Sequence, residues 1–151
     1  MKAAVIRILD ANLNRAQEGL RVCEEVARFV LDARPLASQF RRTRHQLAAA
    51  VTALALSRLE RAQARDSVRD VGRLAGTLNG HRPANLADVL VANFQRVQEA
   101  LRVVEEYAKL LRPKAAARFQ SLRFAAYTLE KTTLARLAAL RHSRPRRRSR
   151  A

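Results

Sequence analysis

The sequence contains few of the residues that cross-link a chain or interrupt helices. Its 151 residues include one cysteine, four glycines, four prolines and no tryptophan. A single cysteine excludes an intrachain disulfide bond and a metal site built from several cysteines. Because glycine and proline are scarce while Ala, Leu, Arg, Glu and Gln are abundant, most of the chain consists of strong helix formers. We therefore predict an all-α fold.

Long apolar runs are also missing. The longest, LAAAVTALAL at residues 47–56, is too short and too rich in alanine to span a bilayer. The N-terminal stretch MKAAVIRILD lacks the apolar region and the small-residue cleavage site of a secretory signal. We therefore expect a cytoplasmic protein that does not enter a membrane. The single cysteine, Cys23, lies among apolar residues, and we expect it to pack in the core.

Acidic residues are few compared with basic ones. The chain has 13 Asp and Glu but 30 Lys and Arg, and its formal net charge is +17. Such a charge favours an anionic ligand, whether a nucleic acid, a membrane surface or a phosphorylated small molecule. Six arginines fall in the final stretch RHSRPRRRSRA, which has little to bury. We predict one helical domain at 1–140 and a disordered basic tail at 141–151, with no specific binding of nucleic acid.

Two stretches of the chain are nearly copies of each other, ANLNRAQEGLRVCEEVA at 11–27 and ANFQRVQEALRVVEEYA at 92–108. Apolar residues recur in both at helical spacing. A proline follows each copy at an equivalent point, and Phe40-x3-Arg44 aligns with Phe119-x3-Arg123. The repeat therefore covers a whole helical hairpin, at about 9–65 and 88–140. Two such hairpins predict an antiparallel four-helix bundle with pseudo-two-fold symmetry.

The apolar pattern also predicts the bounds of each helix. The first should begin near Asp10, whose carboxylate can cap it, and the third at Asn85 or Asp88. The four helices should cover, in order, about 10–32, 36–65, 88–111 and 114–141. The side chains expected to face the core include Leu13, Leu20, Cys23, Val30, Phe40, Leu47, Val51, Leu54, Leu59, Phe119, Leu122, Tyr127, Leu129, Leu134 and Leu137.

Polar residues are repeated with the same spacing. On a helix, Asn12 projects into the apolar sector and Arg15 lies at its edge; Asn93 and Arg96 repeat this placement. Burying such groups costs free energy unless a partner satisfies them. One interpretation is an ion-pair ladder along this edge, because Glu18 is one turn from both Arg15 and Arg21. Glu25, four residues beyond Arg21, would extend the ladder. The other is that the two arginines converge on an anion near the pseudo-two-fold axis, because a planar guanidinium binds two oxygens of a phosphate.

A second group of polar residues lies between the copies. RTRHQL places Arg44 and His45 next to each other, and ARDSVRDVGR places Arg65, Asp66 and Asp70 before a glycine. The two carboxylates could be plain charges at a helix end. Beside a phosphate site they could instead hold Mg²⁺, which takes one or two protein carboxylates and leaves its other positions to water and phosphate. No Gly-Lys-Ser/Thr follows the glycines, so the sequence contains no P-loop.

Together, ILDANLNRAQEGLRVCEEVARFVLD, RTRHQL, RDSVRDVG and DVLVANFQRVQEALRVVEEYAKLL resemble the monofunctional hydroxymethylpyrimidine-phosphate kinase family. This family is the small helical domain that is fused to the N-terminus of some bacterial thiamine-phosphate synthases and that also occurs as a free-standing protein. The resemblance covers nearly all of residues 5–135. It implies a phosphomethylpyrimidine kinase of thiamine biosynthesis, which transfers the γ-phosphate of ATP to the pyrimidine monophosphate with Mg²⁺. A separate thiamine-phosphate synthase would then use the diphosphate.

The resemblance also implies roles for the residues in these motifs. The implied catalytic residues are Arg15, Arg96, Asp66 and Asp70, of which the two aspartates would bind the metal. The implied substrate-binding residues are Asn12, Glu18, Arg44, His45, Asn93 and Glu99. The implied ATP-binding residues are Arg65 and Gly72.

Three other functions fit the same residues. A non-catalytic helical bundle could sense a phosphorylated ligand or bind a partner protein. A helical lyase or mutase resembling chorismate mutase could use inward arginines for a dianionic substrate without ATP or Mg²⁺. A basic nucleic-acid binder would place its phosphate contacts on the outer face of the bundle. The internal symmetry also allows a homodimer.

Overall fold

A computed structural model describes residues 1–71 and 82–143 of the chain. Its helices are α1 (Lys2–Phe29), α2 (Arg34–Ala53), α3 (Arg58–Gln63), α5 (Leu86–Leu111) and α6 (Pro113–Ser143). These two ranges contain no strand, which confirms the predicted all-α class. Gly72 and the part of the predicted tail at 144–151 lie outside the described residues.

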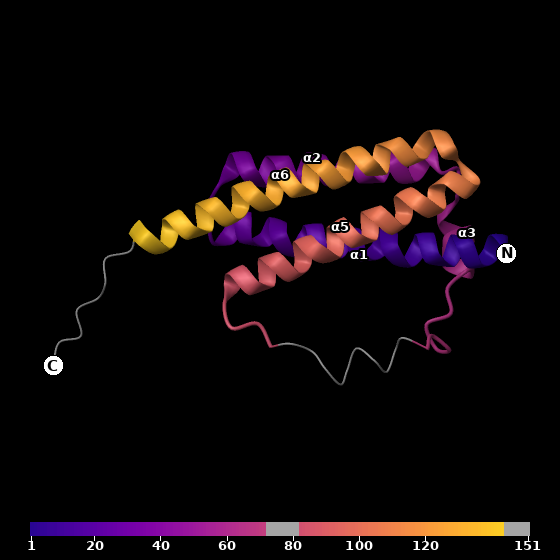
Figure 1. Cartoon of the computed structure of the whole chain (residues 1–151), viewed down its shortest axis with the longest axis horizontal. Helices are drawn as coiled ribbons and strands as arrows, with labels where there is room; N and C mark the ends of the chain where they lie inside the picture. Colours follow the sequence, from indigo (N-terminus) through magenta and orange to yellow (C-terminus); the bar gives the residue numbers. More distant parts are fainter. Residues whose placement is uncertain (72–81, 144–151) are drawn as a thin grey trace.

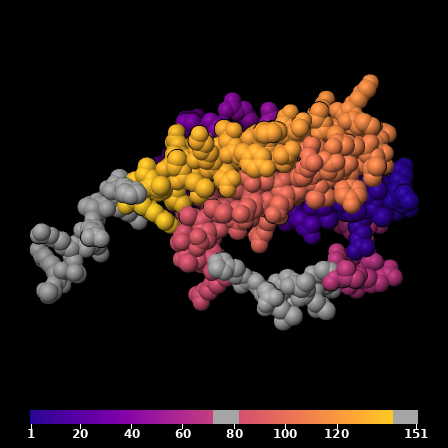
Figure 2. All heavy atoms as spheres, in the orientation of Figure 1, coloured from indigo at the N-terminus to yellow at the C-terminus, as the bar shows by residue number. Residues whose placement is uncertain are grey.

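The four long helices form two hairpins, α1 with α2 and α5 with α6, as the sequence repeat predicts. They pack in the ring order α1, α2, α6, α5, and α1 runs antiparallel to α5 (Figure 1). One layer of the molecule is therefore the α1/α5 pair and the other is the α2/α6 pair. Figure 2 shows the side chains of α5 and α6 meeting along their length.

Two helix bounds differ from the prediction. α1 begins at Lys2, so Asp10 is not a cap but a side chain buried within the helix, where it binds Arg61 and Arg65. α2 ends at Ala53, well before Arg65, because the chain turns at Ala55, whose φ of 53° is left-handed. The third predicted helix begins as expected, with the Asn85 side chain accepting hydrogen bonds from the first turn of α5.

A short helix follows the turn after α2. Ser57 and Glu60 cap α3 reciprocally: the Ser57 hydroxyl accepts from the Glu60 amide, and the Glu60 carboxylate accepts from the Ser57 amide. Leu59 lies on α3 rather than on α2, and its side chain is exposed, so its predicted place in the core is wrong. Val30 and Tyr127 are also exposed, contrary to the prediction.

The core is one continuous cluster drawn from all four long helices. Its largest fully buried side chains include three phenylalanines, of which Phe40 and Phe94 join the two hairpins with ring centroids 6.0 Å apart. Most of the residues predicted to face inward are buried here, including Leu13, Leu20, Leu47, Leu54, Phe119 and Leu122. None of the helices within the described ranges is both long enough and apolar enough to cross a membrane.

Cys23 is part of this core, as predicted, and its thiol should be unreactive. The side chain is fully buried, and burial raises the pKa of the thiol to about 12, with the charge of Glu130 adding to the effect. From the ordinary value of 9.0, this lowers the thiolate fraction at neutral pH by about 1000-fold, one power of ten for each pKa unit.

We expect a thiol reagent at pH 8 to label the native protein at least about 100-fold more slowly than the protein unfolded in denaturant, because the thiolate is the reactive form. A Cys23→Ser variant provides the blank. Equally rapid labelling of native and unfolded protein would contradict the buried position of Cys23.

Candidate anion-binding site

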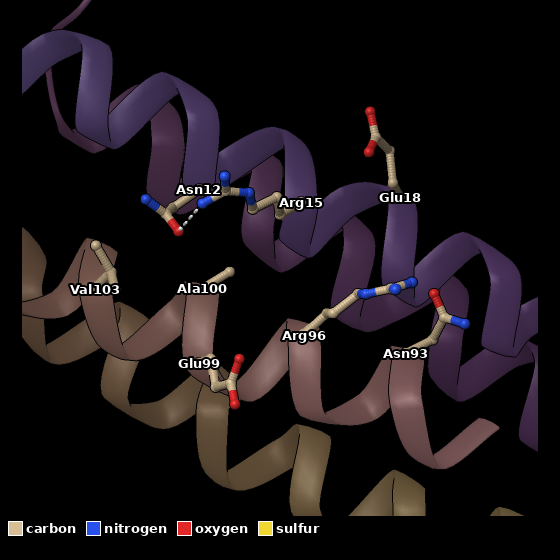
Figure 3. A pocket seen from close by; sticks show the side chains of 8 residues that line it. All are labelled: Asn12, Arg15, Glu18, Asn93, Arg96, Glu99, Ala100 and Val103. Atoms are coloured by element: carbon tan, nitrogen blue, oxygen red, sulfur yellow. Dashed lines mark hydrogen bonds between the residues drawn. The ribbon is translucent and has the colours of Figure 1, made fainter. Parts of the chain in front are cut away.

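A pocket of about 480 Å³ opens between α1 and α5 (Figure 3). The two helices contribute equivalent residues, because each carries one copy of the repeated stretch. Six of the residues that sequence reasoning selected line this pocket together with two apolar ones: Asn12, Arg15, Glu18, Asn93, Arg96, Glu99, Ala100 and Val103. The structure therefore brings the repeated polar residues to one place.

Gly19 lets the two helices approach each other closely beside the pocket. A Cβ atom at this position would lie 2.7 Å from Cγ2 of Val97 and 3.0 Å from the carbonyl oxygen of Asn93. Its equivalent in the second copy is Ala100, which lines the pocket. Sequence reasoning did not select Gly19, although a glycine inside a strong helical pattern is a signal of close packing.

The two asparagines are held in the same way in both halves. Asn12 Nδ2 donates to the Ile8 carbonyl at 2.9 Å, and Asn93 Nδ2 donates to the Val89 carbonyl at 2.8 Å. Each amide nitrogen is thus satisfied within its own helix, and the amide oxygen is left to face the pocket. Asn12 Oδ1 accepts a hydrogen bond of 3.3 Å from Arg15 Nη1. Asn12 therefore orients Arg15.

The two guanidinium groups extend in opposite directions along the helix pair, Arg15 toward Asn12 and Arg96 toward Asn93 (Figure 3). This is the arrangement that a pseudo-two-fold axis between α1 and α5 requires. Neither arginine forms an ion pair with a carboxylate anywhere in residues 1–71 and 82–143. The Glu18 carboxylate is directed away from α5 in Figure 3. Both cations are therefore available to a ligand.

Only part of the ion-pair ladder forms: Glu18 pairs with neither Arg15 nor Arg21 in the described residues, whereas the expected pair of Arg21 with Glu25 is present. Arg21 pairs with Glu25 at 2.8 Å, and its equivalent Arg102 pairs with Glu106 at 2.8 Å. The carboxylates of the repeat therefore hold the neighbouring arginines, not the ones that line the pocket.

Buried carboxylates join the two helices of each hairpin. Glu24 on α1 lies 2.7 Å from Arg44 on α2, although the angle at the nitrogen is not that of a hydrogen bond. Its equivalent, Glu105 on α5, accepts two hydrogen bonds from Arg123 on α6, at 3.2 and 3.0 Å. Arg44 thus has a structural partner within its hairpin and does not line the pocket. His45, also predicted to bind substrate, is an exposed residue of α2 that does not line it either.

The predicted ATP and metal residues Arg65, Asp66 and Asp70 lie in the segment after α3, which contacts the N-terminal half of α1. Arg65 binds the buried carboxylate of Asp10. Arg7 donates to the Asp66 carbonyl at 2.9 Å and lies 3.5 Å from the Asp70 carboxylate. These contacts fix the segment after α3 against α1. The residue equivalent to Asp10 in the second copy is Val91, which has no carboxylate to bind an arginine. The contact between Asp10 and Arg65 therefore has no counterpart in the second copy and breaks the symmetry of the repeat.

Each of the two predicted metal ligands faces a guanidinium. The Asp66 carboxylate accepts a hydrogen bond from Arg69 at 3.0 Å, and Asp70 pairs with Arg7. Among the described residues, no group of three or more His, Cys, Asp or Glu side chains is placed to hold a metal ion. Mg²⁺ at Asp66 and Asp70 and ATP near Arg65 stay predictions.

Comparison with known protein families matches residues 7–132 to the ThiD2 family. The chain belongs to the ThiD2 family. The match includes both copies of the repeat and therefore the whole set of pocket-lining residues. No solved structure matches this ThiD2-family chain.

Curated relatives of this ThiD2-family chain are named thiamine-phosphate synthase. The relative from Nostoc punctiforme is 44% identical over 130 residues, which cover 86% of this chain and 35% of that protein. The relative from Gloeobacter violaceus is 45% identical over 143 residues, 91% of this chain and 40% of that protein. The relative from Rhodopirellula baltica is 39% identical over 136 residues, 90% of this chain and 36% of that protein. The chain thus spans well under half the length of these relatives.

These names support thiamine biosynthesis as the pathway and contradict the predicted activity. A phosphomethylpyrimidine kinase and a thiamine-phosphate synthase are different enzymes, and the relatives carry the second name. The predicted kinase function is therefore corrected. The resemblance holds for a helical domain of thiamine biosynthesis but not specifically for a monofunctional kinase family.

Proposed function

We propose that this chain acts in thiamine phosphate synthesis by binding a phosphorylated small molecule of that pathway in the α1/α5 pocket. The observation that carries the proposal is the pair of arginines, Arg15 and Arg96, in one pocket without a carboxylate partner in the described residues. The pathway comes from the ThiD2 family and from the names of the relatives.

The chemistry of the pocket suits a phosphate monoester. A guanidinium keeps its charge at all physiological pH values and presents paired N–H donors that match two phosphate oxygens. Two guanidinium groups match the charge of a dianion that contacts them directly, although the carboxylates of Glu18 and Glu99 also line the pocket. The pocket volume of about 480 Å³ is in the range of small-molecule sites, roughly 300 to 1,000 Å³. The amide oxygens of Asn12 and Asn93 can orient the arginines or contact the rest of the ligand.

In the longer relatives, this helical domain makes up about a third of a protein named for the formation of thiamine phosphate. We infer that the domain contributes there by holding a phosphorylated substrate or the phosphorylated product. In the present chain, Arg15 and Arg96 would hold the phosphorylated molecule in the same way.

Calorimetric titration of the chain with thiamine phosphate tests the proposal. Thiamine and inorganic phosphate serve as reference ligands. We expect the wild-type chain to bind thiamine phosphate more tightly than unphosphorylated thiamine. The Arg15→Ala/Arg96→Ala variant should lose at least about 100-fold in affinity, since it removes two or more charge-assisted hydrogen bonds that contribute about 1.5 to 3 kcal/mol each.

The matched control is Arg58→Ala/Arg82→Ala, which removes two exposed arginines that do not line the pocket. Its affinity should stay within about twofold of wild type. Equal losses in the two double variants would show a general effect of charge. No binding of any pathway phosphate by well-folded protein would reject the proposal.

A further inference from the structure

The two layers of the bundle differ sharply in charge. α1 and α5 together carry eight arginines and lysines and eight carboxylates, so this layer is balanced. α2 and α6 together carry ten arginines and lysines and one carboxylate, Glu130. That carboxylate accepts a hydrogen bond of 2.6 Å from Gln98 on α5, so it is directed toward the other layer. Two of the ten cations, Arg44 and Arg123, pair with carboxylates of the α1/α5 layer, and the other eight leave the α2/α6 layer basic.

Two adjoining hollows lie along this layer, between α2 and α6. One has a volume of about 450 Å³ and the other about 420 Å³, and they share Gln46 and Ala125 in their linings. They are related by the internal symmetry. The α2 residues of one hollow, Gln39, Arg42, Thr43 and Gln46, correspond in the repeat to the α6 residues of the other, Arg118, Ser121, Leu122 and Ala125. The two hollows thus form one groove with a cation in each half.

The lining of this groove combines two arginines and several neutral polar side chains with the apolar residues Ala49, Leu122, Ala125 and Leu129. Arg42 and Arg118 are both exposed, and neither pairs with a carboxylate in the described part of the chain. No carboxylate lines either hollow. The side-chain amides of Gln39 and Gln46 add neutral donors that are also exposed. The groove therefore offers cations and neutral donors to an extended anion and no carboxylate that would repel it.

We propose that the α2/α6 groove binds the sugar–phosphate backbone of a nucleic acid, without reading its base sequence. Arginine, glutamine, serine and threonine side chains are the groups that contact phosphates in such complexes. A protein partner fits less well, because the core of a protein interface is enriched in aromatic residues and the groove is lined by none. The groove lies on the layer opposite the α1/α5 pocket, so this binding is independent of the proposed thiamine-phosphate site (Figure 1).

The test is fluorescence anisotropy of the full chain with labelled single-stranded and double-stranded oligonucleotides over a series of salt concentrations. The variant Arg42→Ala/Arg118→Ala should bind more weakly to every sequence. The slope of log affinity against log salt concentration should fall by about 1.8 for duplex DNA, since each phosphate contact contributes about 0.9. Circular dichroism checks that the variant stays folded.

Two controls separate this groove from other sources of positive charge. Arg58→Ala/Arg82→Ala removes the same charge elsewhere on the surface, and Arg15→Ala/Arg96→Ala removes it from the α1/α5 pocket. Both should keep the wild-type slope. An equal loss of oligonucleotide affinity in all three variants would mean that the whole chain attracts the oligonucleotide diffusely. Unchanged affinity in Arg42→Ala/Arg118→Ala would mean that other residues bind it. Either result overturns the proposal. The proposal is also overturned if Arg42→Ala/Arg118→Ala loses affinity for poly-glutamate but keeps its affinity for oligonucleotides, since the partner would then be an acidic protein.

Discussion

Replacing Glu105 with alanine should lower the free energy of unfolding by about 3 to 5 kcal/mol, the usual cost of breaking a buried ion pair by removing one partner. The Glu105 side chain is 5% exposed and that of Arg123 is 14% exposed. Two hydrogen bonds link them across the second hairpin. The pKa of Arg123 is raised, first by its hydrogen bond to Tyr127 and then by Glu105, so the guanidinium stays charged. Without the carboxylate, a charge is left buried with too few partners.

Chemical denaturation of the wild type, Glu105→Ala and the double variant Glu105→Ala/Arg123→Met measures this cost. The double variant should recover much of the lost stability, because no unpaired charge remains. The matched comparison is Glu24→Ala in the first hairpin. It should cost less, since Arg44 is 33% exposed and water can solvate it. A loss of under about 1 kcal/mol in Glu105→Ala would contradict the role given to this pair.

The substitution Gly19→Val should both destabilise the protein and disrupt the α1/α5 pocket. The first side-chain atom would already lie 2.7 Å from Val97 Cγ2 and 3.0 Å from the Asn93 carbonyl oxygen. The backbone oxygen cannot move without moving α5. Overpacking of this kind costs about 1 to 3 kcal/mol, and valine is a poor helix former, so no gain in helix propensity offsets it. Separation of the helices would also move Arg15 away from Arg96.

Thermal denaturation and ligand titration of the same Gly19→Val sample measure the two effects together. The equivalent substitution in the second copy, Ala100→Val, adds a smaller increment of volume and serves as the comparison. We expect Gly19→Val to show the larger loss in both measurements. Wild-type stability and wild-type ligand affinity in Gly19→Val would mean that the helices do not need their close approach.

The architecture could be predicted because the sequence contains the same helical hairpin twice. The repeat alone indicates four helices in two equivalent hairpins, and helical spacing places Asn12, Arg15, Asn93 and Arg96 on facing sides of α1 and α5. The structure confirms the all-α class and gathers these four residues in one pocket. Their role in binding stays a prediction.

The partners of the charged residues could not be predicted, since they depend on contacts between distant elements. Sequence alone does not tell which member of the pairs Glu24-Glu25 and Glu105-Glu106 is buried; packing against α2 and α6 decides it. Likewise, Asp10 has the sequence features of a cap, and only the return of the segment after α3 makes it a buried anchor for Arg65.

The predicted end of α2 and the predicted enzymatic activity were both wrong, for different reasons. No glycine or proline marks the turn at Ala55, so the sequence pattern predicts a helix that continues past this residue. The activity was inferred from the resemblance, whereas arginines that suit a phosphate monoester do not specify what reaction follows binding. The names of the relatives corrected that inference.

A crystal structure of the chain with thiamine phosphate tests the central claim most directly. We predict that the phosphate lies between α1 and α5 and accepts hydrogen bonds from both Arg15 and Arg96, near the pseudo-two-fold axis. A phosphate bound elsewhere, such as in the α2/α6 groove, with no contact to either arginine would contradict it.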